Sequence, residues 1–143
     1  MKKKLNCVLL VDDNESDNFI HARVLEKSGV TNHIEIAVNG KDALDFLTST
    51  GKCGHAENQY SQPDLIFLDI NMPIMDGWEF LAEYQKLDEG QKGKIVFIML
   101  TTSLNPTDKT KAEKMLESGC FQYKPLTPQM INDILQLHFP EYL

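Results

Sequence analysis

Four strand-like segments, residues 8–11, 65–68, 95–100 and 121–123, each end directly before polar residues. This spacing constrains the fold more than any other feature of the chain. The polar residues are, in chain order, Asp12 with Asp13, Asp69, Thr101 and Lys124. If the segments are parallel strands of one sheet, their carboxyl ends lie along one edge, where open α/β sheets bind ligands. The sequence therefore predicts that three carboxylates, a hydroxyl and an ammonium group meet in one crevice.

That set of side chains suits a divalent cation and a phosphoryl group. Carboxylates bind hard cations such as Mg²⁺ through oxygen, while lysine and threonine neutralise or hydrogen-bond phosphoryl oxygens. One aspartate at a strand end means little, because loops begin there. Several such residues at several predicted strand ends favour a functional site over solvated loop residues.

Strand-like and helix-like segments alternate along the chain. Residues suited to cap a helix start stand at Asn14, Asn39, Asn105 and Thr127. The expected strands are 5–11, 33–37, 64–68, 94–100 and 121–123, and the expected helices include 15–29 and 77–87. Five βα units result. They predict an α/β fold with right-handed crossovers and helices on both faces of a parallel sheet.

The length of 143 residues predicts one domain, residues 1–143, with a short basic tail at 1–4 and a polar surface insertion at about 49–63. The formal net charge of −7 argues against a nucleic-acid partner, because binding phosphate backbones requires clustered lysine and arginine. No apolar stretch reaches the roughly 20 residues that span a bilayer, and no signal peptide is recognisable. We therefore expect a cytoplasmic protein without membrane contact and without an attached output domain.

The cysteines and histidines give weaker signals. Three cysteines without CxxC spacing, Cys7, Cys53 and Cys120, predict free thiols. Cys53 and His55 in the insertion could form a metal pair, but two ligands do not make a structural zinc site. The remaining histidines show no triad relationship.

Trp78 and the stripe Phe80, Leu81 and Tyr84 are expected to be the packing side chains of a helix. A partner surface is the alternative.

The motifs Asp12-Asp13, Asp69-Ile70-Asn71-Met72-Pro73, Thr101 and Lys124-Pro125 resemble those of the receiver domains of two-component response regulators, the CheY-like proteins. The resemblance extends from about residue 7 to residue 138. It implies a flavodoxin-like (βα)5 doubly wound parallel sheet with strand order 2-1-3-4-5. It also implies a single-domain regulator that accepts a phosphoryl group and switches partner binding.

The resemblance assigns a role to each site residue. Asp69 is the implied phosphoacceptor, Asp13 a direct Mg²⁺ ligand, and Asp12 a ligand mainly through water. The backbone carbonyl of Asn71 is the remaining implied protein ligand. Lys124 is expected to bind a phosphoryl oxygen, Thr101 to be the switch hydroxyl, and the bond before Pro125 to be cis.

Some features depart from the family pattern. Many receivers carry a switching aromatic residue three positions before the conserved lysine, and here it is Phe121, which has no hydroxyl. Switching is therefore expected to act through packing. The segment 118–122 is shorter than in the chemotaxis protein, and the insertion before residue 63 resembles stand-alone receivers encoded beside bacterial phytochromes.

The implied partners are a sensor histidine kinase or a histidine phosphotransfer protein upstream and an unknown protein downstream, with a homodimer through the last two helices as a possibility. Two other classes compete with this interpretation. A haloacid dehalogenase-type phosphatase also uses Asp, Lys and Mg²⁺, but its Asp-x-Asp motif follows the first strand. A degenerate receiver acting as a constitutive binding module would lack part of the site, and no part is missing.

Overall fold

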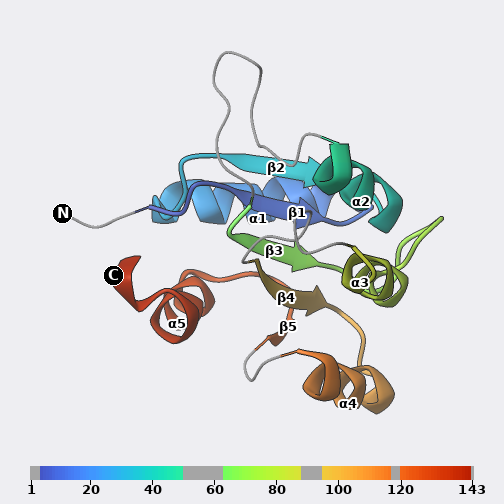
Figure 1. Ribbon diagram of the computed structural model, residues 1–143. Coiled ribbons are helices and arrows are strands. Elements are labelled where there is room, and N and C mark those ends of the chain that lie inside the picture. The colour runs from blue at the N-terminus through green and yellow to red at the C-terminus, as the bar shows by residue number, and fades with distance from the viewer. Residues whose placement is uncertain (1–3, 50–62, 88–94, 117–119, 143) are drawn as a thin grey trace.

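The computed structural model describes residues 4–49, 63–87, 95–116 and 120–142. The elements are β1 (Val8–Val11), α1 (Glu15–Ser28), β2 (Ile34–Ala37), α2 (Gly40–Ser49), β3 (Leu65–Leu68), α3 (Gly77–Gln85), β4 (Val96–Thr101), α4 (Pro106–Met115), β5 (Phe121–Tyr123), α5 (Pro128–His138) and a 3-10 turn, Pro140–Tyr142. The five strands form one parallel sheet in the order β2-β1-β3-β4-β5 (Figure 1). The predicted fold class and strand order are confirmed.

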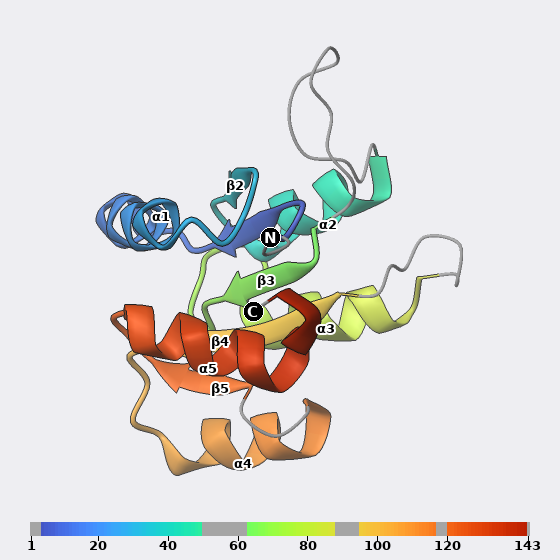
Figure 2. The ribbon, with the colours of Figure 1, turned by 90° about the vertical axis from the view of Figure 1, so that its left-hand side faces the viewer.

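The sheet separates two hydrophobic cores, because successive side chains of a strand point to opposite faces. Val8 and Leu10 of β1 pack with α1 and α5, whereas Leu9 and Val11 pack with α2 and α3. Figure 2 shows α1 and α5 on one side of the strands and α2 and α3 on the other. Each face is covered by helices, which explains why β1 and β3 are apolar at every position.

The helix starts lie where their capping side chains predict them. The side chain of Asn14 accepts a hydrogen bond from the backbone N–H of Asp17, and Asn39, Asn105 and Thr127 cap α2, α4 and α5 in the same way. Helix α1 ends at Gly29, whose φ of 63° is the left-handed conformation that glycine adopts readily. The helices therefore begin at the edge of the sheet where the strands end.

Several predicted boundaries were wrong. The first strand is shorter than 5–11, because Leu5 contributes one isolated bridge to Thr31 and the regular pairing begins at Val8. Thr101 is the last residue of β4 and does not follow it. The third helix ends at Gln85 and not at residue 87. Residue 94, where the fourth strand was expected to start, lies outside the described residues.

The expectation of free thiols was wrong for Cys7. This residue, directly before β1, belongs to a disulfide. The number and spacing of cysteines along the sequence do not give their distances in the fold. They therefore could not reveal this disulfide. Cys120 is a buried thiol whose Sγ lies 3.7 Å from Nε2 of His138. Cys53 and His55, the weak metal pair, lie outside the described residues.

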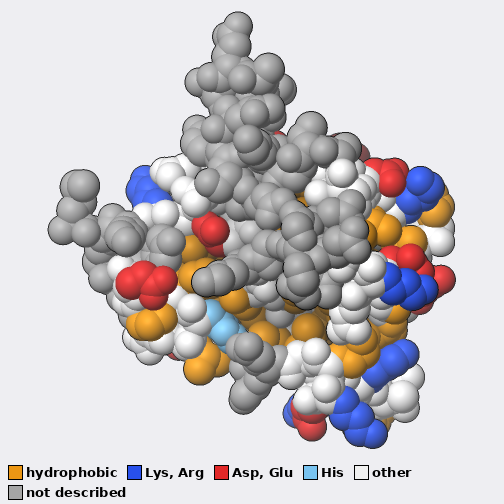
Figure 3. All heavy atoms as spheres, viewed as in Figure 1, with side chains coloured by type: hydrophobic (Ala, Val, Ile, Leu, Met, Phe, Trp, Pro, Cys, Tyr) orange, Lys and Arg blue, Asp and Glu red, His pale blue; other side chains and the backbone are white. Residues whose placement is uncertain are grey.

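Helix α4 exposes three lysines, although the chain as a whole is acidic. Lys109, Lys111 and Lys114 are exposed on this helix, and lysine side chains gather at the lower right of the molecule in Figure 3, where Figure 1 places α4. Within the described residues, no helix combines the length and apolar character needed to cross a bilayer.

Candidate functional site

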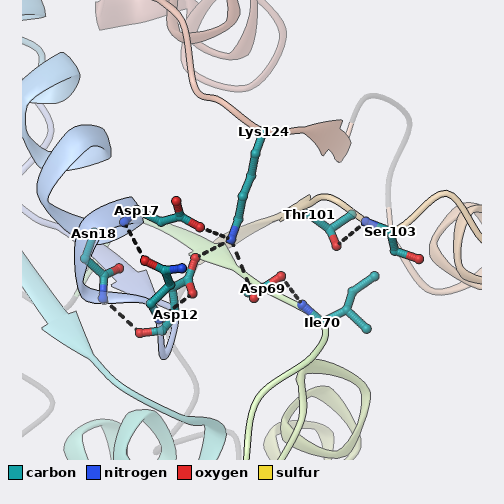
Figure 4. Close-up of polar contacts among 9 residues, drawn as sticks. Asp12, Asp17, Asn18, Asp69, Ile70, Thr101, Ser103 and Lys124 are labelled. Carbon is teal, nitrogen blue, oxygen red and sulfur yellow. Dashed lines mark hydrogen bonds and ion pairs between the residues drawn. The ribbon is translucent and has the colours of Figure 1, made fainter.

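The predicted polar residues meet at the carboxyl edge of the sheet (Figure 4). Asp12 and Asp13 follow β1, Asp69 follows β3, and Lys124 follows β5. One carboxylate oxygen from each of the three aspartates lies within 4.8 Å of the others. Asp12 and Asp69 are buried, while Asp13 is exposed. The sheet order explains this cluster, because β1 and β3 are neighbours at its centre.

Lys124 extends into the middle of these acids. Its Nζ lies 2.6 Å from Oδ2 of Asp12, 2.8 Å from Oδ2 of Asp17 and 3.6 Å from Oδ2 of Asp69. The contact with Asp17 was not predicted from the sequence. A signal was nevertheless available: a helix that follows a strand begins at the carboxyl edge of the sheet, so its first-turn side chains border the site.

Burial and charge shift the pKa values of this cluster. Burial raises the pKa of Asp69, and the nearby Asp12 adds to this effect, while Lys124 opposes it; the result is a pKa of about 6 in place of 3.8. Burial alone would lower the pKa of Lys124. The hydrogen bonds that Lys124 donates to Asp12 and Asp17 outweigh burial, so its pKa is raised above the ordinary value.

Backbone and amide groups hold the acids in place. Oδ1 of Asp12 accepts from the backbone N–H of Asn14 at 2.9 Å, and Asn18 Nδ2 donates to the Asp12 carbonyl at 2.8 Å. Oδ1 of Asp69 accepts from the N–H of Ile70 at 2.9 Å. The second oxygen of each carboxylate, Oδ2, faces Lys124. The start of α1 therefore fixes Asp12, and the loop after β3 fixes Asp69.

The loop between β3 and α3 brings the start of α3 close to Asp69. The residue with positive φ in this loop is Ile74, at 69°, and not a glycine. Gly77 is required because a Cβ at this position would lie 2.5 Å from the carbonyl oxygen of Asp69. Asp76 caps α3 reciprocally with Glu79. Helix α3 therefore packs directly against the backbone of Asp69.

Thr101 and Phe121 lie on the same face of the sheet. Thr101 is fully buried, and its Oγ1 accepts from the backbone N–H of Ser103 at 3.0 Å. Phe121 pairs with Met99 in the register of β4 and β5 and packs, partly buried, against the core under α2 and α3. Because Met99 and Thr101 are two positions apart, their side chains point to that same face.

The two remaining predicted residues flank the cluster. The Lys124–Pro125 peptide bond is cis, as predicted. Asn71 is exposed in the loop after Asp69, and the role of its carbonyl oxygen as a metal ligand stays a prediction.

Nothing in the described part of the chain brings His21, His33 and His138 together as a triad. His21 is buried beneath the site, where burial and the charge of Lys124 lower its pKa.

The residues at this edge fit a divalent cation. Asp12, Asp13 and Asp69 offer carboxylate oxygens, the donor type that Mg²⁺ and similar hard cations bind. Three carboxylates this close repel one another unless positive charge lies among them. Lys124 supplies one such charge, and the exposure of Asp13 leaves one side of the cluster open to solvent.

The raised pKa of Asp69 predicts a pH-dependent stability. With a folded pKa of about 6 and an ordinary value of 3.8, the folded state binds this proton more tightly than the unfolded chain. Stability therefore falls as pH rises through this window and stays lower above it. An Asp69→Asn variant should exceed the wild type in free energy of unfolding by up to about 3 kcal/mol at about pH 7.5, with little difference below about pH 4.

Urea unfolding of both proteins in EDTA measures this difference. The comparison with the variant cancels the acid sensitivity that both proteins share. A stability difference that does not change with pH would contradict the assigned ionisation of Asp69.

A parallel sheet of this order, with an acid cluster and a lysine at its carboxyl edge, defines a CheY-like signalling domain of the flavodoxin-like class. The family model for the response regulator receiver domain matches residues 8–136, and the chain belongs to this family. Members of the family are signalling switches rather than classical enzymes. The chain is accordingly a receiver domain of two-component phosphorelay signalling.

Individual relatives agree with this membership. The chain is 33% identical over 129 residues to two-component response regulator 24 of Arabidopsis thaliana, covering 89% of this chain and 79% of that protein. It is 31% identical over 138 residues to hybrid signal transduction histidine kinase I of Dictyostelium discoideum, covering 95% of this chain but 7% of that much longer protein.

Solved structures agree as well. A two-component response regulator from Cytophaga hutchinsonii superposes with a TM-score of 0.79 at 28% identity, covering 94% of this chain and 97% of that one. The Mn²⁺-bound form of response regulator Rcp1 superposes with a TM-score of 0.69 at 30% identity, covering 95% and 94%.

Proposed function

We propose that Asp69 is the phosphoacceptor of this regulator and that Asp12, Asp13, Asp69 and the carbonyl of Asn71 hold a Mg²⁺ ion beside it. The observation that carries this proposal is the cluster itself: three carboxylates have oxygens within 4.8 Å of one another, and Nζ of Lys124 lies 3.6 Å from Asp69. The Mn²⁺-bound form of the similar protein Rcp1 supports a divalent cation.

The proposed reaction is phosphoryl transfer to a carboxylate. An oxygen of Asp69 forms a bond to phosphorus while the phosphorus–nitrogen bond of a phosphohistidine, or the phosphorus–oxygen bond of acetyl phosphate, breaks. The bound Mg²⁺ supplies positive charge that offsets the negative charge on the transferred group. The product is an acyl phosphate on Asp69, which later reacts with water.

Lys124 is proposed to bind a phosphoryl oxygen. Its Nζ already contacts three carboxylates, so it has a short path from Asp12 and Asp17 to a phosphoryl group on Asp69. An ammonium group there stabilises the charge on the transferred oxygens. In the resting protein the same group neutralises the acids. Lys124 therefore exchanges one set of anionic partners for another during the reaction.

Thr101 and Phe121 are proposed to carry the signal from Asp69. A phosphoryl oxygen offers the Thr101 hydroxyl a hydrogen-bond acceptor that the resting state lacks, and movement of this hydroxyl frees space for Phe121. A ligand shifts an equilibrium between two conformations only through its different affinity for each. One charge-assisted hydrogen bond is worth about 1.5–3 kcal/mol, enough to change partner affinity about ten- to a hundredfold.

The proposed donors are a sensor histidine kinase or a histidine phosphotransfer protein. The similarity to a segment of a hybrid histidine kinase supports this class of donor. We further propose that residues 1–143 act as one receiver domain.

Acetyl phosphate with Mg²⁺ tests the function. We expect each molecule to take up one phosphoryl group, measured by intact mass, and EDTA to prevent this. The same preparation should release no phosphate from p-nitrophenyl phosphate at a steady rate, because an acyl phosphate intermediate that turns over slowly cannot sustain ester hydrolysis. Many rapid turnovers of the ester would instead identify a phosphatase of the haloacid dehalogenase type.

A further inference from the structure

A chain of hydrogen bonds runs from the buried Thr101 hydroxyl to the outer surface of α3. Oγ1 of Thr101 accepts from the backbone N–H of Ser103 at 3.0 Å. The Ser103 hydroxyl donates to Oδ2 of Asp108 at 2.6 Å. Oδ1 of the same carboxylate accepts from Nε1 of Trp78 at 3.1 Å. Four residues from β4, the following loop, α4 and α3 are thus joined in sequence.

Asp108 is the branching point of this chain. It lies in the first turn of α4, is half-buried, and uses one oxygen for the loop and the other for α3. A hydrogen bond to a charged acceptor is about twice as strong as one between neutral groups. The carboxylate therefore couples the position of Ser103 to that of Trp78 more firmly than a neutral acceptor would.

Trp78 differs from the other aromatic residues of α3. Phe80 and Tyr84 are buried in the core, as predicted, while Trp78 is half-buried, and Nζ of Lys111 lies 5.0 Å from its ring centroid. The indole thus sits between α3 and α4 at the molecular surface. A movement of the loop after β4 would change its surroundings.

We propose that Asp108 is a positioning residue of the switch, which transmits the state of Thr101 through Ser103 to Trp78 and so reports phosphorylation at the surface between α3 and α4. This inference rests on the proposed role of Asp69. When Thr101 turns toward a phosphoryl group on Asp69, its Oγ1 leaves the N–H of Ser103. The loop then rearranges, and Asp108 carries that change to the indole. The route is separate from the one through Phe121.

The single tryptophan of the chain makes the test direct, because its indole N–H gives one resonance in an NMR spectrum. Beryllofluoride with Mg²⁺ serves as the phosphoryl mimic, and fluorine NMR reports its uptake independently. In the wild type we expect the indole resonance to shift when beryllofluoride binds. In Asp108→Ala, beryllofluoride should still bind at Asp69, but most of the indole shift should be lost.

Two variants control for a merely structural effect. Asp108→Asn should restore a large part of the shift, because an amide oxygen can accept from Trp78 while the amide N–H group donates to the Ser103 hydroxyl. Asp42→Ala removes another first-turn acid, on α2, and should leave the full response. Retention of the wild-type shift in Asp108→Ala, or no shift in a wild type that has bound beryllofluoride, would overturn the proposal.

The resting protein provides a test that does not depend on Asp69. Thr101→Ala removes the acceptor of the Ser103 N–H, so the indole resonance should move without any phosphoryl mimic. If beryllofluoride failed to bind the wild type, the proposed role of Asp69 would be in doubt. The Thr101→Ala variant would then test the hydrogen-bond chain through Asp108. An unmoved indole resonance in that variant would refute this chain.

Discussion

An Asp69→Asn variant will take up no detectable phosphoryl group from acetyl phosphate and Mg²⁺, while the wild type will take up one. The amide of asparagine has the shape of the carboxylate but lacks a nucleophilic anionic oxygen, so the acyl phosphate cannot form. Intact mass measures the incorporation, and peptide mapping measures its position. The expected loss is complete, because the reacting atom itself has been replaced.

Asp64→Asn is a matched control for this substitution. Asp64 directly precedes β3, at the opposite end of the strand from Asp69, and its Oδ2 accepts from the backbone N–H of Asn6 at 2.6 Å. This variant should be labelled as fully as the wild type. Undiminished labelling of Asp69→Asn, or label mapped to another aspartate in the wild type, would refute the acceptor assignment.

Asp13→Ala should weaken Mg²⁺ binding by at least about tenfold and should abolish Mg²⁺-dependent phosphorylation. Loss of an outer-shell partner of a metal ligand already costs about 10- to 100-fold in affinity, and loss of a ligand should cost no less. Asp13 is exposed, so its removal should leave the folded structure intact. Titration calorimetry with MgCl₂ measures the affinity, and circular dichroism confirms folding.

Asp45→Ala, on the exposed side of α2, controls for a general loss of negative charge. It removes the same single negative charge without touching the cluster. Its Mg²⁺ affinity should equal that of the wild type. Wild-type affinity in Asp13→Ala would mean that the ligand set proposed for the cation is wrong.

The sequence predicted the sheet and most of the site because both depend on local signals. Apolar runs identify strands, and asparagine or threonine at a capping position identifies the helix that follows. Parallel topology then brings the ends of β1, β3 and β5 to one edge, so Asp12, Asp69 and Lys124 could be predicted as neighbours before any coordinates were known.

The features that the sequence did not predict depend on distances across the fold. Gly77 is needed because α3 approaches the backbone of Asp69, and Cys7 pairs through proximity rather than spacing. The contact between Asp108 and Trp78 joins residues 30 positions apart on two helices. Such contacts depend on how helices pack on the sheet, which hydrophobic periodicity alone does not specify.

The ion pair between Lys124 and Asp12 has a consequence for biogenesis. These residues are 112 positions apart, so the ribosome makes the acid long before its cationic partner. Until β5 docks beside β4, Asp12, Asp17 and Asp69 face one another without Lys124, and their repulsion opposes a compact site. A nascent or truncated chain therefore cannot present the complete pocket, and competence to receive a signal is confined to molecules that have finished folding.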